Sequence, residues 1–473
     1  MVDGRALTAQ FEDAADFETR KVLCGGQLLT VLFLDGLTSG GDIAEQVVRP
    51  LAQMTDEARE EVLYTRALQG GVWCASVKEP ESTQQAAELL VNGFCVILFP
   101  GSGKALGCEV KTGEKRSPSP PETENTVKGA KDAFTETLRT NTSLVRRHLR
   151  TPGLRLSETV IGKRTLTKVT VCWIDRLTDP ELPRRMQERL SSIDIDGALS
   201  PAAIEEYVTG SRRTAFPLLE YTERTDHFCQ GLLDGQVGLL ADGLPLGYLA
   251  PVGLGRLMRS PEDRATDFFS ASMLRLLRYA ALGVSLLLPG LYAAMAMFHQ
   301  QMLPTKLLLS IIESKQNVPF STLLEVLGLL CAFELLQQAG LHLPQAVGTA
   351  VSIIGGLVVG TAAVDAKLVS PAALIVTASS GICGFTLPNR ELSDAVRLWR
   401  FVLTVLAGLW GLFGVTVGLL LLLTELAGLE SLGRSYLSPF GRAEVKGALV
   451  RPRLVRQKWR DGALKPMDDQ NQR

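Results

Sequence analysis

The stretch Phe401-Val-Leu-Thr-Val-Leu-Ala-Gly-Leu-Trp410-Gly-Leu-Phe-Gly-Val-Thr-Val-Gly-Leu-Leu-Leu-Leu-Leu-Thr424 contains no charged residue. A helix needs about 20 apolar residues to cross the roughly 30 Å hydrocarbon core of a bilayer. Three earlier stretches are also long and uncharged, namely Tyr279–Phe298, Leu341–Val364 and Leu368–Asn389. Four such stretches in succession are difficult to bury in a soluble fold. The last third of the chain is therefore predicted to form an all-α multispan membrane domain.

The average composition conceals this division of the chain. The net charge of −1 and the 21% of charged residues combine a charged region, about 1–270, with an almost neutral one, about 279–427. The first 20 residues contain five acidic side chains and no apolar core of a signal peptide, so we expect the N-terminal region to stay cytoplasmic. The eight cysteines form no C-x-x-C pair, which favours reduced, mostly buried thiols over disulfides or zinc ligands.

The N-terminal region contains an internal duplication. Val31-Leu-Phe-Leu-Asp35 resembles Val171-Cys-Trp-Ile-Asp175, and Gly93 has a counterpart in Gly235 at nearly the same offset. Each copy has the pattern of a buried strand, a turn and an amphipathic helix. We therefore predict two related α/β lobes, about 20–112 and 160–255. The expected divisions are a first lobe 1–112, a linker and helix 113–158, a second lobe 159–262, a membrane domain 263–427 with four to five spans, and a basic tail 428–473.

No catalytic or nucleotide-binding motif is complete. Gly101-Ser-Gly103-Lys104 resembles part of a phosphate-binding loop, but Ala105 replaces the required hydroxyl and the upstream glycine is missing. This segment is instead predicted to be a hairpin turn. The four histidines are far apart in sequence and are expected to be structural. We predict no enzyme activity, no cofactor, no metal site and no nucleic-acid partner.

The segment Phe320–Leu341 is long enough to cross a membrane but carries Glu325 and Glu334. Their spacing places them on roughly opposite faces of a helix. A carboxylate in hydrocarbon is costly and normally faces protein or water. Both acids are therefore candidates for an ion path or for coupling to a neighbour. The alternative is a helix at the membrane interface or ordinary packing between helices, with both acids hydrated.

Two pairs of small residues are candidates for helix packing. Gly356 and Gly360 form one G-x-x-x-G motif, and Gly414 and Gly418 form another. Small side chains let helix backbones approach closely in lipid. The motifs are compatible with packing within one chain and with association between chains.

The predicted topology contains a conflict. Five spans from a cytoplasmic N-terminus would place the basic tail outside, and the basic segment 390–400 lies on the opposite side of the last span from that tail. Four spans, with Phe320–Leu341 or another segment in the interface, would place both termini inside, and we favour that number. The tail and Trp459 are also expected to contact anionic membrane lipids.

A set of motifs extends over about residues 16–440. They include Asp16-Phe17, Phe33-Leu-Asp35-Gly36, Arg49-Pro50-Leu51, Val127-Lys-Gly129, Ala133-Phe134-Thr135-Glu136-Thr-Leu138-Arg139-Thr-Asn141, Ser260-Pro-Glu-Asp263, Leu274-Arg275-Leu-Leu-Arg278-Tyr279, Leu288-Pro289-Gly-Leu-Tyr292, Val318-Pro319-Phe320 and Tyr436-Leu-Ser-Pro439. In these residues the chain resembles the GerA spore germination family, specifically the A-type subunit of nutrient germinant receptors.

The resemblance implies a protein of the spore inner membrane with its N-terminal region in the spore core. It also implies a transporter-like B-type subunit and a C-type lipoprotein as partners, and a ring of A-type subunits that releases ions. The family includes a homologue associated with the dipicolinic-acid channel as well. We expect an oligomeric ligand-gated cation channel that couples nutrient sensing to ion release, or alternatively a non-conducting scaffold for germination proteins.

Overall fold

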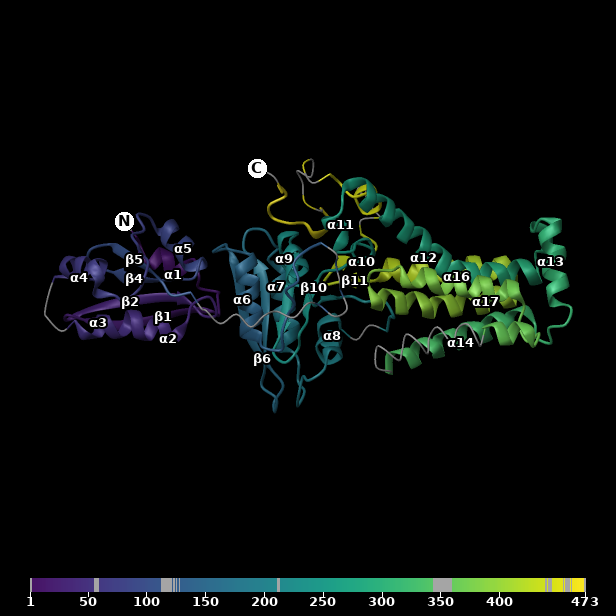
Figure 1. Ribbon diagram of the computed structural model, residues 1–473, viewed down its shortest axis with the longest axis horizontal. Helices are drawn as coiled ribbons and strands as arrows, with labels where there is room; N and C mark the ends of the chain where they lie inside the picture. The colour runs from purple at the N-terminus through teal and green to yellow at the C-terminus, as the bar shows by residue number, and fades with distance from the viewer. Residues whose placement is uncertain are drawn as a thin grey trace.

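The computed structural model describes the chain except for residues 1, 55–58, 112–120, 122–123, 125, 127, 211–212, 343–359, 439, 441–444, 454, 456–459, 461 and 472–473. The described residues form two β-sheet lobes followed by a long helical bundle (Figure 1). The prediction of two α/β lobes and an all-α multispan membrane part is thereby confirmed.

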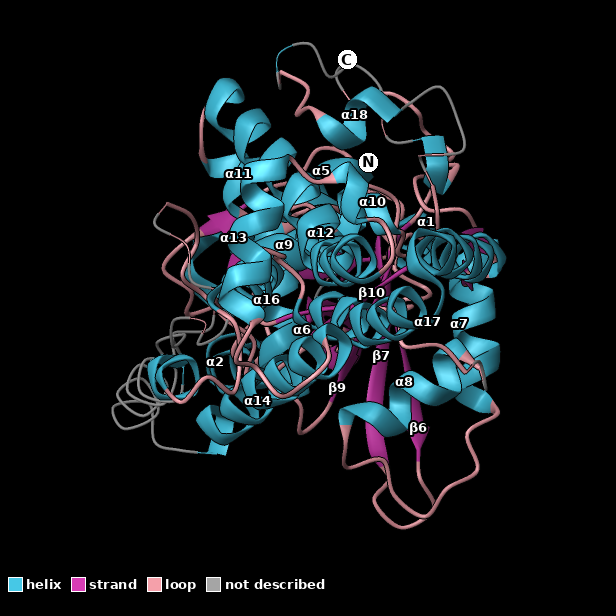
Figure 2. Cartoon of the chain, turned by 90° about the vertical axis from the view of Figure 1, so that its right-hand side faces the viewer, coloured by secondary structure: helices cyan, strands magenta, loops and turns pink. Residues whose placement is uncertain are grey.

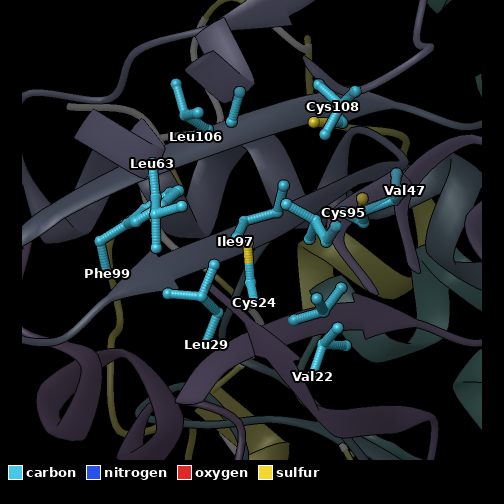
Figure 3. Close-up of a cluster of buried hydrophobic side chains, with 14 of the residues drawn as sticks. Val22, Cys24, Leu29, Val47, Leu63, Cys95, Ile97, Phe99, Leu106 and Cys108 are labelled. Carbon is cyan, nitrogen blue, oxygen red and sulfur yellow. The ribbon is translucent and has the colours of Figure 1, made fainter. Parts of the chain in front are cut away.

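The first lobe is built on a five-stranded antiparallel sheet in the order β1-β2-β4-β5-β3. Its strands are β1 Phe17–Cys24, β2 Gln27–Leu34, β3 Val77–Lys78, β4 Phe94–Phe99 and β5 Lys104–Glu109. Alternate side chains of β2 enter two cores, with Val31 on one face and Leu32 on the other. Figure 3 shows the first core, in which Leu29, Ile97 and Leu106 gather between the strands.

Short helices cover the two faces of this sheet. Against one core lie α3 Arg49–Gln53 and α4 Glu60–Arg66, and against the other lie α1 Gly4–Ala9 and α5 Thr83–Val91. The strands β4 and β5 are almost wholly buried because both of their faces are covered.

The second lobe repeats the plan of the first with the sheet order β6-β7-β9-β10-β8. The strands are β6 Leu154–Ile161, β7 Thr167–Ile174, β8 Glu220–Thr222, β9 Val237–Ala241 and β10 Gly247–Ala250. The helices are α7 Glu181–Ser191, α8 Pro201–Thr209 and α9 Thr225–Leu233. The paired glycines of the duplication, Gly93 and Gly235, both have positive φ, at 81° and 98°, in the turns that lead into β4 and β9. A side chain is strained in that conformation, so both copies require glycine there.

The helix α6, Leu138–His148, lies in the predicted linker segment and joins the two lobes. It packs into the core of the second lobe through Val145, while Ser143 donates a hydrogen bond of 2.9 Å to the carbonyl of Gly36 in the first. A main-chain bond of 2.8 Å from Ala15 to Leu156 also connects the lobes.

Among the described residues of the helical part, three helices are long and apolar enough to cross a membrane by length and composition. They are α12 Phe268–Met297, α14 Thr322–His342 and α17 Arg390–Gly428. The prediction Tyr279–Phe298 falls in α12, and the segment Phe320–Leu341 forms α14, which packs against α16 and α17. The prediction Leu341–Val364 lies almost entirely outside the described residues.

Two shorter helices complete the bundle. The prediction Leu368–Asn389 contains only the 15-residue α16, Pro371–Phe385, which begins after the capping residue Ser370. The helix α13, Thr305–Lys315, lies across the end of the bundle remote from the lobes (Figure 1). Figure 2 looks along the bundle and places α12, α16 and α17 next to one another.

The helix α17 reverses direction at Gly411, whose φ of 60° and ψ of −140° are not helical. A Cβ atom on Gly414 would lie 1.9 Å from the carbonyl oxygen of Leu406, and one on Gly418 would lie 2.5 Å from the side chain of Leu403. These contacts are possible only if the residues after Gly411 run back along the residues before it. The prediction of Phe401–Thr424 as one continuous span is therefore wrong, because this stretch forms a helical hairpin.

The hairpin removes the topological conflict. The ends of both legs meet in one core, where Leu392 and Val396 pack with Leu422 and Leu426. After the second leg, Ser431 donates a hydrogen bond of 2.6 Å to the carbonyl of Leu218 in the second lobe. The basic segment 390–400 and the tail thus lie at the same end of the bundle, next to the lobes. Trp459 lies outside the described residues.

Candidate functional site

A cluster of buried ion pairs connects the second lobe to the start of the bundle. Glu220 on β8 accepts a hydrogen bond of 2.7 Å from Arg256 Nε and lies 2.8 Å from His227 Nε2. The Nη1 atom of Arg256 donates a hydrogen bond of 3.0 Å to Asp234. Burial alone would raise the pKa of Glu220, but the charges of Arg256 and His227 outweigh it and lower the pKa to about 2. The carboxylate is therefore ionised at neutral pH and holds the cluster together.

This cluster continues to the foot of α12. Asp234 also binds Arg264 at 3.0 Å, and Arg264 belongs to the short helix α11, Glu262–Ala265. In the same helix the buried Asp263 binds Arg275 and Arg278 of α12, at 3.1 and 2.8 Å. A charged group that is paired on every side resists displacement, because moving it would leave a buried charge without a partner. The cluster therefore acts as a stiff joint between a lobe and a candidate span.

Glu325 lies at the end of the bundle remote from the lobes and is 2% exposed. One carboxylate oxygen accepts a hydrogen bond from the backbone N–H of Ser370, just before α16, and the other lies 3.4 Å from Lys315 Nζ. The start of a helix carries a partial positive charge, which favours a carboxylate at this place. Glu325 thus joins α13, α14 and α16.

Glu334 lies nearer the lobes and is half-buried. Its carboxylate accepts a hydrogen bond of 2.7 Å from Arg397 Nη1 on the first leg of α17. The same nitrogen binds the Gln337 side chain at 2.8 Å, and Nη2 of Arg397 binds Asp394. Glu325 and Glu334 therefore lie in separate networks at different levels of the bundle.

Arg400 lies one turn further into the bundle and is 2% exposed. Its Nη1 donates a hydrogen bond of 3.0 Å to Ser380 Oγ, which itself donates to the carbonyl of Ser285 at 2.8 Å. Its Nε has no hydrogen-bond partner among the described residues. An ionisable group among membrane helices is costly, so such groups mark candidate functional positions.

The four glycines that the sequence predicts at helix–helix contacts fall into two groups. Gly414 and Gly418 lie on the second leg of the hairpin and allow close approach of the first leg. Gly360 contacts Leu374, at 3.6 Å from the position of a Cβ atom, while Gly356 lies outside the described residues. For Gly414 and Gly418 the structure shows packing within one chain, and a role of Gly356 and Gly360 stays a prediction.

Arg397, Arg400 and Lys315 were missed as site residues in the sequence. The arginines looked like charges that flank a span, because the hairpin that draws them into the bundle has no strong sequence signal. The spacing of Asp394, Arg397 and Arg400 at successive turns of one helix was the available clue. Within the described part of the chain, no group of three or more potential ligands is arranged to hold a metal ion.

A cavity of about 770 Å³ lies where the second lobe meets α17. Its walls include Glu205 and Glu206 of α8, Phe216 of the following loop, and Glu391 and Asp394 of α17. Burial raises the pKa of Glu205. Beside the cavity, Thr214 donates a hydrogen bond of 2.8 Å to Glu425, and Phe216 packs in one core with Leu392 of α17.

Comparison with known proteins identifies the family. The family described as Bacillus/Clostridium GerA spore germination protein matches residues 5–466. The uncharacterized membrane protein YfkQ of Bacillus subtilis (strain 168) is 36% identical over 450 residues, which cover 94% of this chain and 87% of YfkQ. Spore germination protein KA of the same organism is 34% identical over 448 residues, which cover 93% of this chain and 81% of that protein.

Among solved structures, the chain is similar to the N-terminal domain of the A subunit of the Bacillus megaterium spore germinant receptor GerK3. The identity is 24% and the TM-score 0.42, over 52% of this chain and 92% of that domain. The apolar helices and the relatives together identify a membrane protein, and the resemblance to A-type subunits is confirmed. The chain belongs to the Bacillus/Clostridium GerA spore germination protein family.

Proposed function

We propose that this chain is the A-type subunit of a germinant receptor in the spore inner membrane, with its lobes in the spore core. It couples nutrient sensing to ion release as an oligomeric ligand-gated cation channel. The names of the relatives support a role in germination. The observation that carries the coupling role is a set of ion pairs that leads from Glu220 through Arg256 and Asp234 to Arg264 of α11. The next residue in that helix, the buried Asp263, binds Arg275 and Arg278 of α12.

The proposed mechanism is a shift between two arrangements of the bundle. A ligand changes such an equilibrium only if it binds one arrangement more tightly than the other. Because the joint at the foot of α12 is stiff, a rotation of the second lobe moves Arg275 and Arg278 with it. The helix α12 then transmits that motion to α17, against which it packs.

The proposed partners follow from the family. A transporter-like B-type subunit supplies the nutrient site, and a C-type lipoprotein completes the receptor. A second copy of this chain supplies the neighbouring wall of a ring. The proposal assigns the chain no catalytic activity and no cofactor.

The coupling role is tested in spores that carry Asp263→Asn in the chromosomal copy. We expect ion release, triggered by a mixture of amino acids and sugars, to fall at least about tenfold, because Arg275 and Arg278 lose their shared carboxylate. Asp196→Asn is the matched control, since Asp196 and its partner Arg164 are both largely exposed. Normal ion release by Asp263→Asn spores that contain wild-type amounts of the protein would contradict the coupling role.

The alternative is a scaffold that conducts nothing. It is favoured by the finding that Glu325 and Glu334 are both ion-paired, with Lys315 and Arg397 respectively. Planar-bilayer recording of the purified protein distinguishes the two, because a scaffold gives no conductance under any condition. If Glu325→Gln and Glu334→Gln together leave ion release unchanged, neither acid lies on an ion path.

The number of subunits is a direct test of the ring. Native mass spectrometry of the protein extracted in mild detergent should give a single closed assembly of several subunits. A monomer, or a dimer found only with other receptor subunits, would contradict a pore formed by this chain alone.

A further inference from the structure

Two arginines on the first leg of α17 differ in the number of hydrogen-bond acceptors around them. Arg397 binds Glu334 at 2.7 Å, Gln337 at 2.8 Å and, through its other nitrogen, Asp394. Arg400, three residues further along the helix, binds only the hydroxyl of Ser380 among the described side chains. Among the described residues, the more deeply buried guanidinium of Arg400 therefore has no carboxylate partner, whereas that of Arg397 has two.

Glu334 lies where a small shift of α14 would let it pair with either Arg397 or Arg400. The helix α14 runs antiparallel to the first leg, because Leu323 packs on Gly408 at one end and Glu334 binds Arg397 at the other. Three residues of helix correspond to about 4.5 Å along its axis. A slide of α14 by that distance away from the lobes brings Glu334 level with Arg400.

The helix α14 is also the least enclosed of the three candidate spans. Only 22% of its apolar part is buried, against 39% for α12 and for α17. After the slide each arginine would have one carboxylate, since Arg397 keeps Asp394 on its own helix. The slide breaks the contact of Glu325 with the backbone of Ser370. It also gives the buried guanidinium of Arg400 a charged partner. Two registers of a helix can interchange only where losses and gains of this kind offset each other.

We propose that Glu334 alternates between Arg397 and Arg400, so that α14 has two registers against α17 that differ by three residues, or about 4.5 Å along the helix axis. The structure shows the register in which Arg397 holds the carboxylate. The proposal concerns the position of a helix and is independent of what the protein senses and of whether it conducts ions.

The test measures helix position directly in the full-length protein extracted in mild detergent. One nitroxide is placed at the native, exposed Cys331 of α14 and a second at Leu199→Cys, since Leu199 is 80% exposed on the second lobe. Serine replaces the two other accessible cysteines, Cys74 and Cys383, and excess unlabelled chain suppresses distances between subunits. Pulsed electron–electron double resonance then gives the distribution of distances.

We expect Arg397→Gln to populate a distance up to about 4.5 Å longer than the main wild-type distance, because Arg400 becomes the better partner. Arg400→Gln should leave only the shorter distance. Combining Arg397→Gln with Glu334→Gln should abolish the longer one. A reference pair at Leu199→Cys and Leu409→Cys, with Cys331 replaced by serine, reports the position of α17 and not of α14, and it should be unchanged throughout.

The proposal is overturned if Arg397→Gln keeps the wild-type distribution, or if Arg397→Gln and Arg400→Gln shift it equally. Arg390→Gln, at the start of the same helix, is the matched control and should change nothing. If Arg397→Gln does not assemble, Arg397→Lys replaces it, because lysine keeps the charge but loses the planar fork that holds Glu334 and Asp394 together.

Discussion

Arg146 and Asp16 form a two-bonded ion pair between the lobes, in which Nε and Nη2 of the arginine each lie 2.8 Å from a carboxylate oxygen. The arginine side chain is 1% exposed and the aspartate 10%. Such parallel bonds fix both distance and orientation. The pair therefore sets the angle at which the first lobe meets α6 and the second lobe.

Asp16→Asn should loosen this joint strongly. Removing one partner of a buried pair leaves the other charge uncompensated and costs about 3–5 kcal/mol. Hydrogen exchange of the full-length protein, followed by mass spectrometry, should show faster exchange in α6 and β1. The control is Asp35→Asn, because the Asp35–Arg139 pair also joins the first lobe to α6 but is much more exposed, and its loss should cost less than about 1 kcal/mol. Equal exchange in the two variants would contradict the prediction.

The pair of Asp132 and His148 should make the linker sensitive to alkaline pH. A 2.6 Å contact with the carboxylate raises the pKa of His148, and the same contact lowers the pKa of Asp132 to about 2. A raised histidine pKa contributes stability that is complete below the ordinary value of about 6.5 and is lost as pH rises through the raised value. The aspartate contribution is lost only as pH falls toward 2.

The thermal stability of the wild-type protein should therefore fall as the pH rises from about 6 to 9. Part of this fall should be absent in His148→Gln. The measurement is the slope of the thermal unfolding midpoint of the full-length protein against pH across that range. His227→Gln is not a suitable control, because His227 belongs to the buried cluster around Glu220, and Lys163→Gln on the surface serves instead. Parallel slopes for wild type and His148→Gln would show that the pair does not titrate in this range.

The hairpin at Gly411 predicts which side of the membrane each end of α17 faces. Single cysteines at Arg390 and Glu430 should both react with a membrane-impermeant maleimide added on the side of the lobes, and one at Phe413 should react from the other side. Serine replaces the accessible native cysteines Cys74, Cys331 and Cys383 in these variants. A straight helix would instead place Arg390 and Glu430 on opposite sides.

Gly414→Ala should destabilise the bundle. The new methyl group would lie 1.9 Å from the carbonyl oxygen of Leu406, and backbone atoms cannot rotate away as a flexible side chain can. Overpacking of this kind costs about 1–3 kcal/mol or more. The unfolding midpoint in detergent should fall, whereas Gly283→Ala, which meets no atom within 4 Å, should leave it unchanged or slightly higher. Equal midpoints for the two variants would contradict the close approach of the legs.

The lobes were predictable because each copy of the duplication supported the other. Asp35 and Asp175 follow equivalent strands, and Gly93 and Gly235 require the same left-handed backbone. The membrane part was less predictable because hydropathy measures composition and not direction. The uncharged run around Gly411 is long enough for one span, and a single glycine conformation turns it into two shorter legs.

The candidate site could be predicted only in part from the sequence. Glu325 and Glu334 stood out as acids within an apolar segment, but their partners come from distant parts of the chain. Lys315 lay in a segment too charged to span, and Arg397 lay just before the last apolar run. Only the folded bundle reveals that these charges meet. The part played by either acid in ion flow stays a prediction.

The return of the chain through the hairpin has a consequence for biosynthesis. Leu432, which follows the last helix, is 3% exposed and belongs to the same core as Val169 and Val237 of the second lobe. Ser431 also accepts a hydrogen bond of 3.0 Å from the backbone of Val252. A ribosome makes the rest of that lobe some 180 residues earlier than these two side chains. The second lobe therefore cannot complete this core until the chain has been synthesised through the last helix.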